Sequence, residues 1–198
     1  MMKITGGNLR GRNVESRPHK SLRPTTGRVR EAIFNMLIHG RFLNNENFVS
    51  DGKHLIEGRK VLDIFCGTGI LGIEAFSRGA EHVTLVDEDS RTIEITKQNV
   101  RNLGVNANIL RSDSTKLPRA THKCSLVFMD PPYNSNLAND SLKSLKEQNW
   151  LEDKAIIILE HGIKEVIQPP EGYTILDERE YNKTQIMLLQ YRELRTEI

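Results

Sequence analysis

At 198 residues, the chain has the length of one domain with a substantial hydrophobic core. Its 37% hydrophobic and 27% charged residues are typical of a soluble protein, and no apolar run approaches the roughly 18 residues of a membrane span. The first residues lack the apolar segment of a secretory signal, the two cysteines are too few for a disulfide framework, and the six histidines have no ligand spacing. We therefore expect a cytoplasmic protein that has no membrane or metal partner.

The net charge of +2 conceals an uneven distribution of charged residues. Residues 1–30 carry eight Lys and Arg residues and one Glu, a net charge of +7, and the rest of the chain has a net charge of −5. A basic segment on a mildly acidic body predicts an anionic partner, although a solvated leader is the alternative. A hairpin is favoured over a leader by glycines placed between apolar residues, namely Gly6, Gly7 and Gly11 among Ile4, Leu9 and Val14.

The basic segment is expected to end in a helix over residues 28–39, which Thr25 or Thr26 can cap. Arg28 and Arg30 lie at the N-terminal end of this helix, where the dipole disfavours cations and a bound anion would relieve the conflict. A polar, asparagine-rich stretch at 41–58 then reads as a loop. We therefore predict a basic N-terminal arm at 1–40, a linker loop at 41–58 and a catalytic domain at 59–198.

From residue 59 onward, short apolar strands alternate with helices. This alternation is typical of a doubly wound α/β fold with a mostly parallel sheet, and two final strands without a helix between them predict an antiparallel hairpin. The expected strands are 61–65, 83–87, 107–110, 125–130, 155–160, 173–179 and 185–191, and the expected helices are 70–78, 90–103 and 138–148.

A glycine-rich motif follows the first of these strands. Residues 67–72 read G-T-G-I-L-G, which fits the G-x-G-x-x-G pattern and opens the next predicted helix. Asp87 lies 20 residues beyond Gly67, at the end of the second strand, where an acid binds ribose hydroxyls. The pattern alone predicts a nicotinamide dinucleotide.

Asp63, inside the strand before the glycine motif, favours a different cofactor. A carboxylate at this place would repel a pyrophosphate in a low-dielectric cleft. S-adenosylmethionine carries an ammonium and a sulfonium group and no phosphate, so Asp63 favours it, unless this acid only braces the loop or caps the helix. Asp113, after the third strand, could accept a hydrogen bond from the adenine amino group, although aspartate is also a common turn former there.

The fourth strand ends in Asp130-Pro131-Pro132-Tyr133. Each proline lacks an N–H group and keeps the residue before it extended, so the Asp130 carboxylate and the Pro131 carbonyl become two rigid acceptors. Hydrogen bonds from both N–H groups of a nucleobase amine would turn its lone pair toward a sulfonium methyl group, and they strengthen as charge develops on nitrogen. An aspartate with a pKa of about 3.9 is too weak a base to deprotonate that amine first, so we assign it orientation and charge stabilisation.

Tyr133 is expected to stack on the same base, an interaction worth roughly 1–3 kcal/mol. A base in a helix must be flipped out to enter such a site, so a flipped or single-stranded target is implied. An ordinary turn after a strand is the alternative for residues 130–133.

A resemblance to known proteins is carried by the N-terminal segments at residues 4–7, 10–12, 22–26, 28–31 and 34–35, and by 62–63, 65–72, 74–75 and 77–80 in the cofactor region. With the turn at 130–133, the chain resembles class I methyltransferases of the amino-group type. Its N-terminal segments are similar to the RsmD family of bacterial 16S rRNA guanine-N2 methyltransferases. The resemblance spans nearly the whole chain. One departure is Asn182 after Tyr181, where the family usually has glycine, and asparagine tolerates the left-handed backbone that such a turn needs.

The resemblance implies S-adenosylmethionine as cofactor, a guanine in 16S rRNA as target, and small-subunit assembly particles carrying ribosomal proteins as partner. It assigns catalysis to Asp130, Pro131, Pro132 and Tyr133, cofactor binding to Asp63, Phe65, Gly67, Thr68, Gly69, Asp87 and Asp113, and RNA binding to Arg10, Arg12, Arg23, Thr25, Arg28 and Arg30. The alternatives are an amino-methyltransferase that acts on DNA adenine or protein glutamine, an RNA-binding assembly factor without turnover, and an NAD-dependent oxidoreductase.

Overall fold

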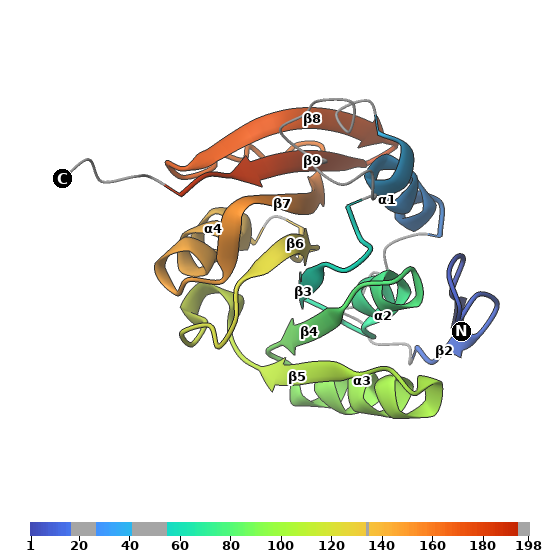
Figure 1. The fold of residues 1–198 in the computed structure, drawn as a ribbon. Coiled ribbons are helices and arrows are strands. Elements are labelled where there is room, and N and C mark those ends of the chain that lie inside the picture. Colours follow the sequence, from blue (N-terminus) through green and yellow to red (C-terminus); the bar gives the residue numbers. More distant parts are fainter. Residues whose placement is uncertain (17–26, 41–54, 134, 194–198) are drawn as a thin grey trace.

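The computed structural model describes residues 1–16, 27–40, 55–133 and 135–193. Its centre is a seven-stranded sheet in the order β5-β4-β3-β6-β7-β9-β8 (Figure 1). The strands from β3 to β7 run parallel, and β9 pairs antiparallel with both β7 and β8. The strands are β3 Lys60–Ile64, β4 His82–Asp87, β5 Ala107–Arg111, β6 Cys124–Met129, β7 Leu151–Gly162, β8 Tyr173–Tyr181 and β9 Thr184–Tyr191.

Helices cover both faces of the sheet (Figure 1). One core cluster packs side chains of α1 and α2 against the sheet, and a second cluster on the other face includes residues of α4. The helices are α1 Gly27–His39, α2 Ile70–Ser77, α3 Ser90–Leu103 and α4 Leu137–Glu147, with a short 3-10 turn, η2, at Ser114–Lys116. Among the described helices, none is long and apolar enough to cross a membrane.

This architecture confirms the predicted mostly parallel α/β sheet with an antiparallel C-terminal hairpin. Among the strands, β7 differs most from its predicted bounds, because it begins at Leu151 rather than at residue 155. Its pairing with β6 also shifts register between Cys124 and Leu126. The order of strands reverses at β3, whose neighbours are β4 on one side and β6 on the other. In open α/β sheets, ligands bind beyond the carboxyl ends of the strands at such a switch point.

The N-terminal segment forms the expected hairpin and helix. Strands β1, Met2–Lys3, and β2, Asn13–Val14, pair antiparallel. Ile4 and Val14 of this hairpin and Phe34 of α1 are fully or almost fully buried in the same core as the main sheet. Ile56, inside the predicted linker, is buried there too, whereas 41–54 lie outside the described residues. The predicted arm is thus packed on the main sheet and shares its core.

Candidate active site at the carboxyl ends of β3, β4 and β6

The turn between β3 and α2, Phe65 to Gly69, is here named the glycine loop. Its backbone is left-handed at Phe65 (φ 65°), Gly67 (φ 56°) and Gly69 (φ 79°), which only glycine adopts without cost. Holding Phe65 in this region costs of the order of 1–3 kcal/mol, a type of strain that gathers at ligand sites. One turn further on, a Cβ atom on Gly72 would lie 2.4 Å from Leu85 Cδ2. The glycines therefore serve both the tight turn and the close packing of helix on strand.

Asp63 lies beneath this loop, and its carboxyl group braces the start of α2. Its Oδ2 atom accepts a hydrogen bond from the Gly72 N–H at 2.9 Å, and the residue is 2% exposed. Burial raises the pKa of Asp63 to about 8, with smaller contributions from Asp130 and Asp87. The sequence argument treated Asp63 as ionised, but at neutral pH without a cation beside it the carboxyl group is mostly protonated. The role that the structure gives Asp63 is to brace the start of α2, which was the alternative to cofactor binding in the sequence analysis.

Asp87 ends β4 and contacts the glycine loop directly. Its Oδ2 atom accepts from the Gly67 N–H at 3.0 Å, and its Oδ1 atom accepts from the Asp89 N–H at 3.0 Å. Burial raises the pKa of Asp87 above its ordinary value. A carboxylate oxygen can accept two hydrogen bonds, so each atom retains capacity for a ribose hydroxyl.

Asp113 follows β5 and forms a turn, which was the alternative for this residue. Its Oδ1 atom accepts from both the N–H and the hydroxyl of Thr115, at 2.8 and 2.7 Å, and caps η2. These bonds lower the pKa of Asp113, so its carboxylate is ionised at neutral pH. An ionised acceptor is compatible with an amino group, but the turn alone accounts for the aspartate.

Two side chains of α3 that sequence reasoning missed hold the glycine loop from below. The Thr96 hydroxyl donates to the Gly67 carbonyl at 2.7 Å, and the Asn99 side-chain amide donates to the Thr68 carbonyl at 3.0 Å. Asn99 also exchanges two hydrogen bonds with the backbone of Glu15, just after β2. Thr92, Thr96 and Asn99 are buried on one face of α3, and polar residues on the buried face of an amphipathic helix are the signal that could have identified them.

The residues from Asp130 to Tyr133, here named the DPPY turn, follow β6 directly. Because β6 pairs with β3, the turn lies beside Asp63 and the glycine loop, as the sequence predicts. Pro131 is buried, Pro132 is exposed and Tyr133 is half-buried. The Tyr133 hydroxyl contacts Glu160 of β7 and Thr184 of β9, two residues that sequence reasoning also missed.

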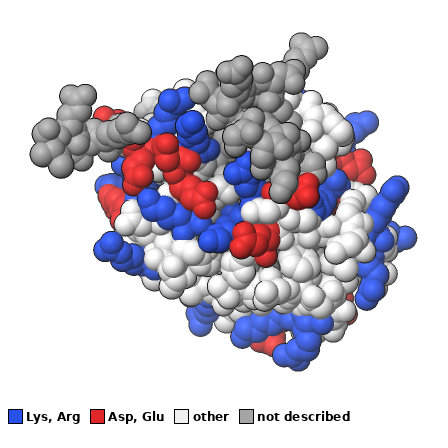
Figure 2. Space-filling view, viewed as in Figure 1, with Lys and Arg blue, Asp and Glu red and all other residues white. Residues whose placement is uncertain are grey.

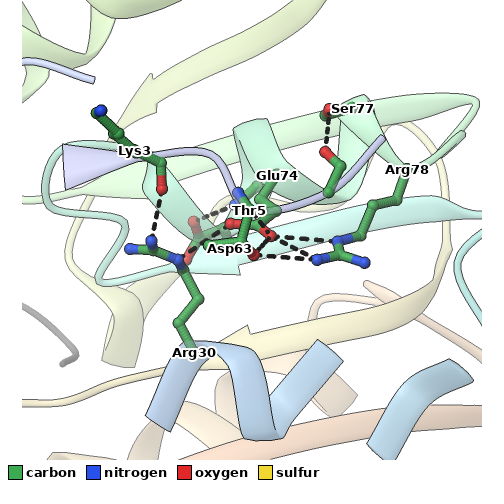
Figure 3. A network of polar contacts seen from close by, with 9 residues as sticks. Lys3, Thr5, Arg30, Asp63, Glu74, Ser77 and Arg78 are labelled. Carbon is green, nitrogen blue, oxygen red and sulfur yellow. Dashed lines mark hydrogen bonds and ion pairs between the residues drawn. The ribbon is translucent and has the colours of Figure 1, made fainter. Parts of the chain in front are cut away.

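Arg30 is not available for RNA, which corrects the sequence-based assignment. The residue is 3% exposed, its Nε atom lies 3.0 Å from Glu74 Oε2 as an ion pair without hydrogen-bond geometry, and its Nη2 atom donates to the Lys3 carbonyl. Glu74, in α2, also accepts from Arg78 at 2.7 Å and from the Thr5 hydroxyl (Figure 3). A buried carboxylate needs such partners, so Arg30 neutralises Glu74 and ties α1 to α2.

Three of the other residues predicted to contact RNA lie at the surface, unlike Arg30. Arg10, Arg12 and Arg28 are exposed, whereas Arg23 and Thr25 lie outside the described residues. Lys and Arg side chains gather at the right-hand edge of the face in Figure 2, where the hairpin lies. The structure therefore presents two of the predicted arginines, Arg10 and Arg12, on a common exposed hairpin.

Close backbone contact fixes this hairpin to the end of α2. The Asn8 N–H donates to the Ser77 carbonyl at 2.8 Å, and the Ser77 hydroxyl donates to the Gly6 carbonyl at 2.6 Å. Gly7 is left-handed (φ 75°), and a Cβ atom on it would lie 1.7 Å from the Ser77 carbonyl oxygen. Gly7 is thus required for this docking, and the basic hairpin is held against the helix that the glycine loop opens.

Known proteins are similar to this chain in both fold and sequence. The family model described as "Conserved hypothetical protein 95" matches residues 2–190. The chain is 32% identical to "Ribosomal RNA small subunit methyltransferase D" of Haemophilus influenzae over 90% of this chain and 88% of that protein. It is 30% identical to the protein of the same name from Buchnera aphidicola, over 93% and 91% of the two chains.

A solved structure agrees with these sequence comparisons. The Escherichia coli protein described as "Putative methyltransferase yhhF" superposes with a TM-score of 0.77 and 28% identity over 96% of this chain and 98% of that one. The fold, the family model and the relatives thus agree along nearly the whole length of the chain. The chain belongs to the RsmD family of methyltransferases.

Proposed function

We propose that this protein transfers a methyl group from S-adenosylmethionine to the exocyclic N2 amine of a guanine in 16S rRNA. The observation that carries the proposal is the meeting of the glycine loop, Asp87 and the DPPY turn at the ends of three adjacent strands. The rRNA substrate is supported by the relatives, which are named as small-subunit rRNA methyltransferases. The guanine N2 position comes from the family resemblance.

The residues at the glycine loop fit a cationic adenosine cofactor. Asp63, Asp87 and Asp130 are close enough for the two others to raise the pKa of Asp63. Such a group of carboxyls is stabilised by a nearby cation and destabilised by a phosphate. Bound S-adenosylmethionine supplies an electrophilic methyl group on a sulfonium. Asp87 would hold the ribose hydroxyls, Thr68, Gly69 and Phe65 would line the cofactor, and Asp113 would lie on the adenine side.

The DPPY turn would hold the amine that accepts the methyl group. The Asp130 carboxylate and the Pro131 carbonyl accept its two N–H groups, which directs the nitrogen lone pair toward the cofactor. Pro132 has no N–H to compete for these acceptors, and its ring keeps Pro131 extended. Tyr133 stacks on the flipped base. Arg10, Arg12 and Arg28 contact RNA phosphates, and the same role is assigned to Arg23 and Thr25 through the resemblance.

Methyl transfer to small ribosomal subunits tests this function. Purified protein with tritiated S-adenosylmethionine should label one guanine in 16S rRNA of subunits from cells that lack the enzyme. Naked 16S rRNA in parallel distinguishes free RNA from the particle carrying ribosomal proteins. Labelling of protein or of DNA instead of 16S rRNA would overturn the proposal.

A further inference from the structure

The hydroxyl group of Tyr133 forms hydrogen bonds within the protein itself, and its single hydrogen is used there. It donates to Glu160 Oε1 at 3.1 Å and lies 2.6 Å from Thr184 Oγ1. A tyrosine hydroxyl has one hydrogen, so once this hydrogen is donated to Glu160, the Thr184 hydroxyl must donate to the tyrosine oxygen. Burial is the main cause that raises the pKa of Tyr133, to about 12, so the hydroxyl keeps its hydrogen at physiological pH.

The sheet brings these three residues together from distant parts of the sequence. Strand β7 runs parallel to β6, so the end of β7 carrying Glu160 lies beside the DPPY turn. Strand β9 returns antiparallel from the turn at Asn182 (φ 58°), which places Thr184 opposite Gly162. The Ile163 N–H donates to the Lys183 carbonyl at 3.2 Å and fixes this turn to β7. The left-handed Asn182 confirms that asparagine replaces the family's usual glycine without loss of the turn.

Glu160 and Thr184 offer a rigid support. Both are 5% exposed, whereas Tyr133 is half-buried between this support and the surface. A tyrosine side chain has two main torsions, and hydrogen bonds at its far end restrict both. Two buried polar groups at one end of the ring therefore set its position at the end of β6.

We propose that Glu160 and Thr184 are positioning residues that hold the ring of Tyr133 in the orientation in which it stacks on the target base. This inference rests on the proposed function and adds to it that Tyr133 offers the base a ring face and no hydrogen-bond donor. A ring without a hydroxyl would supply the same face. In this chain the hydroxyl serves to fix the ring.

A double-mutant cycle on methyl transfer tests the positioning role. The single-turnover rate on small subunits is measured for Glu160→Ala, Tyr133→Phe and the double variant. Loss of one hydrogen bond to a carboxyl group is expected to slow transfer roughly tenfold in Glu160→Ala, with an unchanged Kd for S-adenosylmethionine. If Glu160 acts only through the tyrosine hydroxyl, the double variant is no slower than Tyr133→Phe. An unchanged rate in Glu160→Ala, or effects that multiply in the double variant, would overturn the proposal.

Conservative variants separate positioning from folding. Glu160→Gln keeps an acceptor for the tyrosine hydroxyl and should restore most of the rate. Thr184→Ser should likewise retain activity and Thr184→Val should lose a few-fold, which provides a second test if Glu160→Ala fails to fold. Glu178→Gln, on the exposed side of β8, is the matched control and should leave the rate unchanged. An equal loss of rate in Glu160→Gln and Glu160→Ala would contradict the positioning role of Glu160.

A measurement without RNA tests the positioning role of Glu160 separately from the proposed function. In NMR spectra of the cofactor-free protein with 13C-labelled tyrosine, the Tyr133 signals are assigned through Tyr133→Phe. Glu160→Ala should increase the mobility of this ring and leave the other tyrosines unchanged. If the Tyr133 ring is as immobile in Glu160→Ala as in the wild type, the positioning role is overturned. If the wild-type protein does not label small subunits, the proposed function is overturned.

Discussion

The glycine loop and the DPPY turn end adjacent strands, yet the protein holds them in different ways. In the glycine loop, the Gly67 N–H bonds to Asp87, and the carbonyls of Gly67 and Thr68 accept from side chains of α3. The two prolines of the DPPY turn have no N–H groups, and in the described contacts its tip is held through the Tyr133 hydroxyl.

This difference matches what each turn is proposed to bind. A backbone whose polar groups are fixed by the protein offers a preorganised surface, which suits a cofactor of constant shape. The two prolines supply no N–H donor of their own and hold the backbone extended, a geometry that suits acceptance of an amine from a flipped base. Changes at the two turns should therefore have separate consequences. Changes in the DPPY turn should reduce methyl transfer, and changes at the glycine loop should reduce stability or cofactor affinity.

The largest effect is expected on methyl transfer, from Asp130→Ala in the DPPY turn. Removing an acceptor that stabilises charge in the transition state should lower kcat by about 10²–10³-fold. The Kd for S-adenosylmethionine, measured by calorimetry, should change by less than a few-fold. Asp130→Asn keeps an acceptor oxygen and should have intermediate activity. A loss of cofactor binding as large as the loss of rate would remove the distinction between the two turns.

On the cofactor side, Gly72→Ala should destabilise the fold. The new Cβ atom would lie 2.4 Å from Leu85 Cδ2 and 2.9 Å from Val83 Cγ1, so helix α2 or strand β4 must shift. Overpacking of this kind costs about 1–3 kcal/mol in the free energy of unfolding, which urea titration measures. Gly27→Ala at the start of α1 is the matched control, because a Cβ atom there meets no described atom within 4 Å. A Gly72→Ala protein as stable as this control would show that the contact relaxes without cost.

How far these regions could be predicted from the sequence depends on the distance over which each contact acts. Strands, helices and the two site motifs follow from local periodicity and spacing, and the structure confirms the element types. Thr96, Asn99, Glu160 and Thr184 act on residues at least 27 positions away, so their roles become visible only once the sheet order is known.

Arg30 shows how a local pattern was misinterpreted. The sequence interpretation groups Arg30 with Arg28 as part of one basic end. However, two residues that are two positions apart in a helix point in directions about 200° apart around its axis. Arg30 lies at helical spacing with Ile33, Phe34 and Leu37, which form the buried face of α1. The single acid within the apolar helix α2, Glu74, was the matching signal for a buried cation.

The pH dependence of stability should depend on Asp63. Burial raises the pKa of Asp63 from 3.8 to about 8, so the folded protein binds this proton more tightly than the unfolded chain does. The stabilisation is fully present below about pH 4 and is lost progressively as the pH rises to about 8. Because Asp87 shifts in the same direction, the difference between wild type and Asp63→Asn isolates Asp63. Urea unfolding between pH 5 and 8.5 should show a shallower decline for Asp63→Asn, and parallel curves would contradict the shift.

The smallest effect is expected from Arg10→Gln, because the hairpin lies outside both turns. Losing one phosphate contact should weaken RNA binding a few-fold and reduce the slope of log Kd against log salt by roughly 0.7–0.9. The single-turnover rate at saturating RNA should not change, since Arg10 is exposed and takes no part in the described contacts of either turn. Lys143→Gln is the matched control, because this exposed lysine belongs to α4, a helix that lies across the molecule from the hairpin (Figure 1). If both variants alter the salt slope equally, the hairpin is no more than part of a diffuse positive surface. A change in slope for Arg10→Gln alone would separate RNA capture by the hairpin from the chemistry of the two turns.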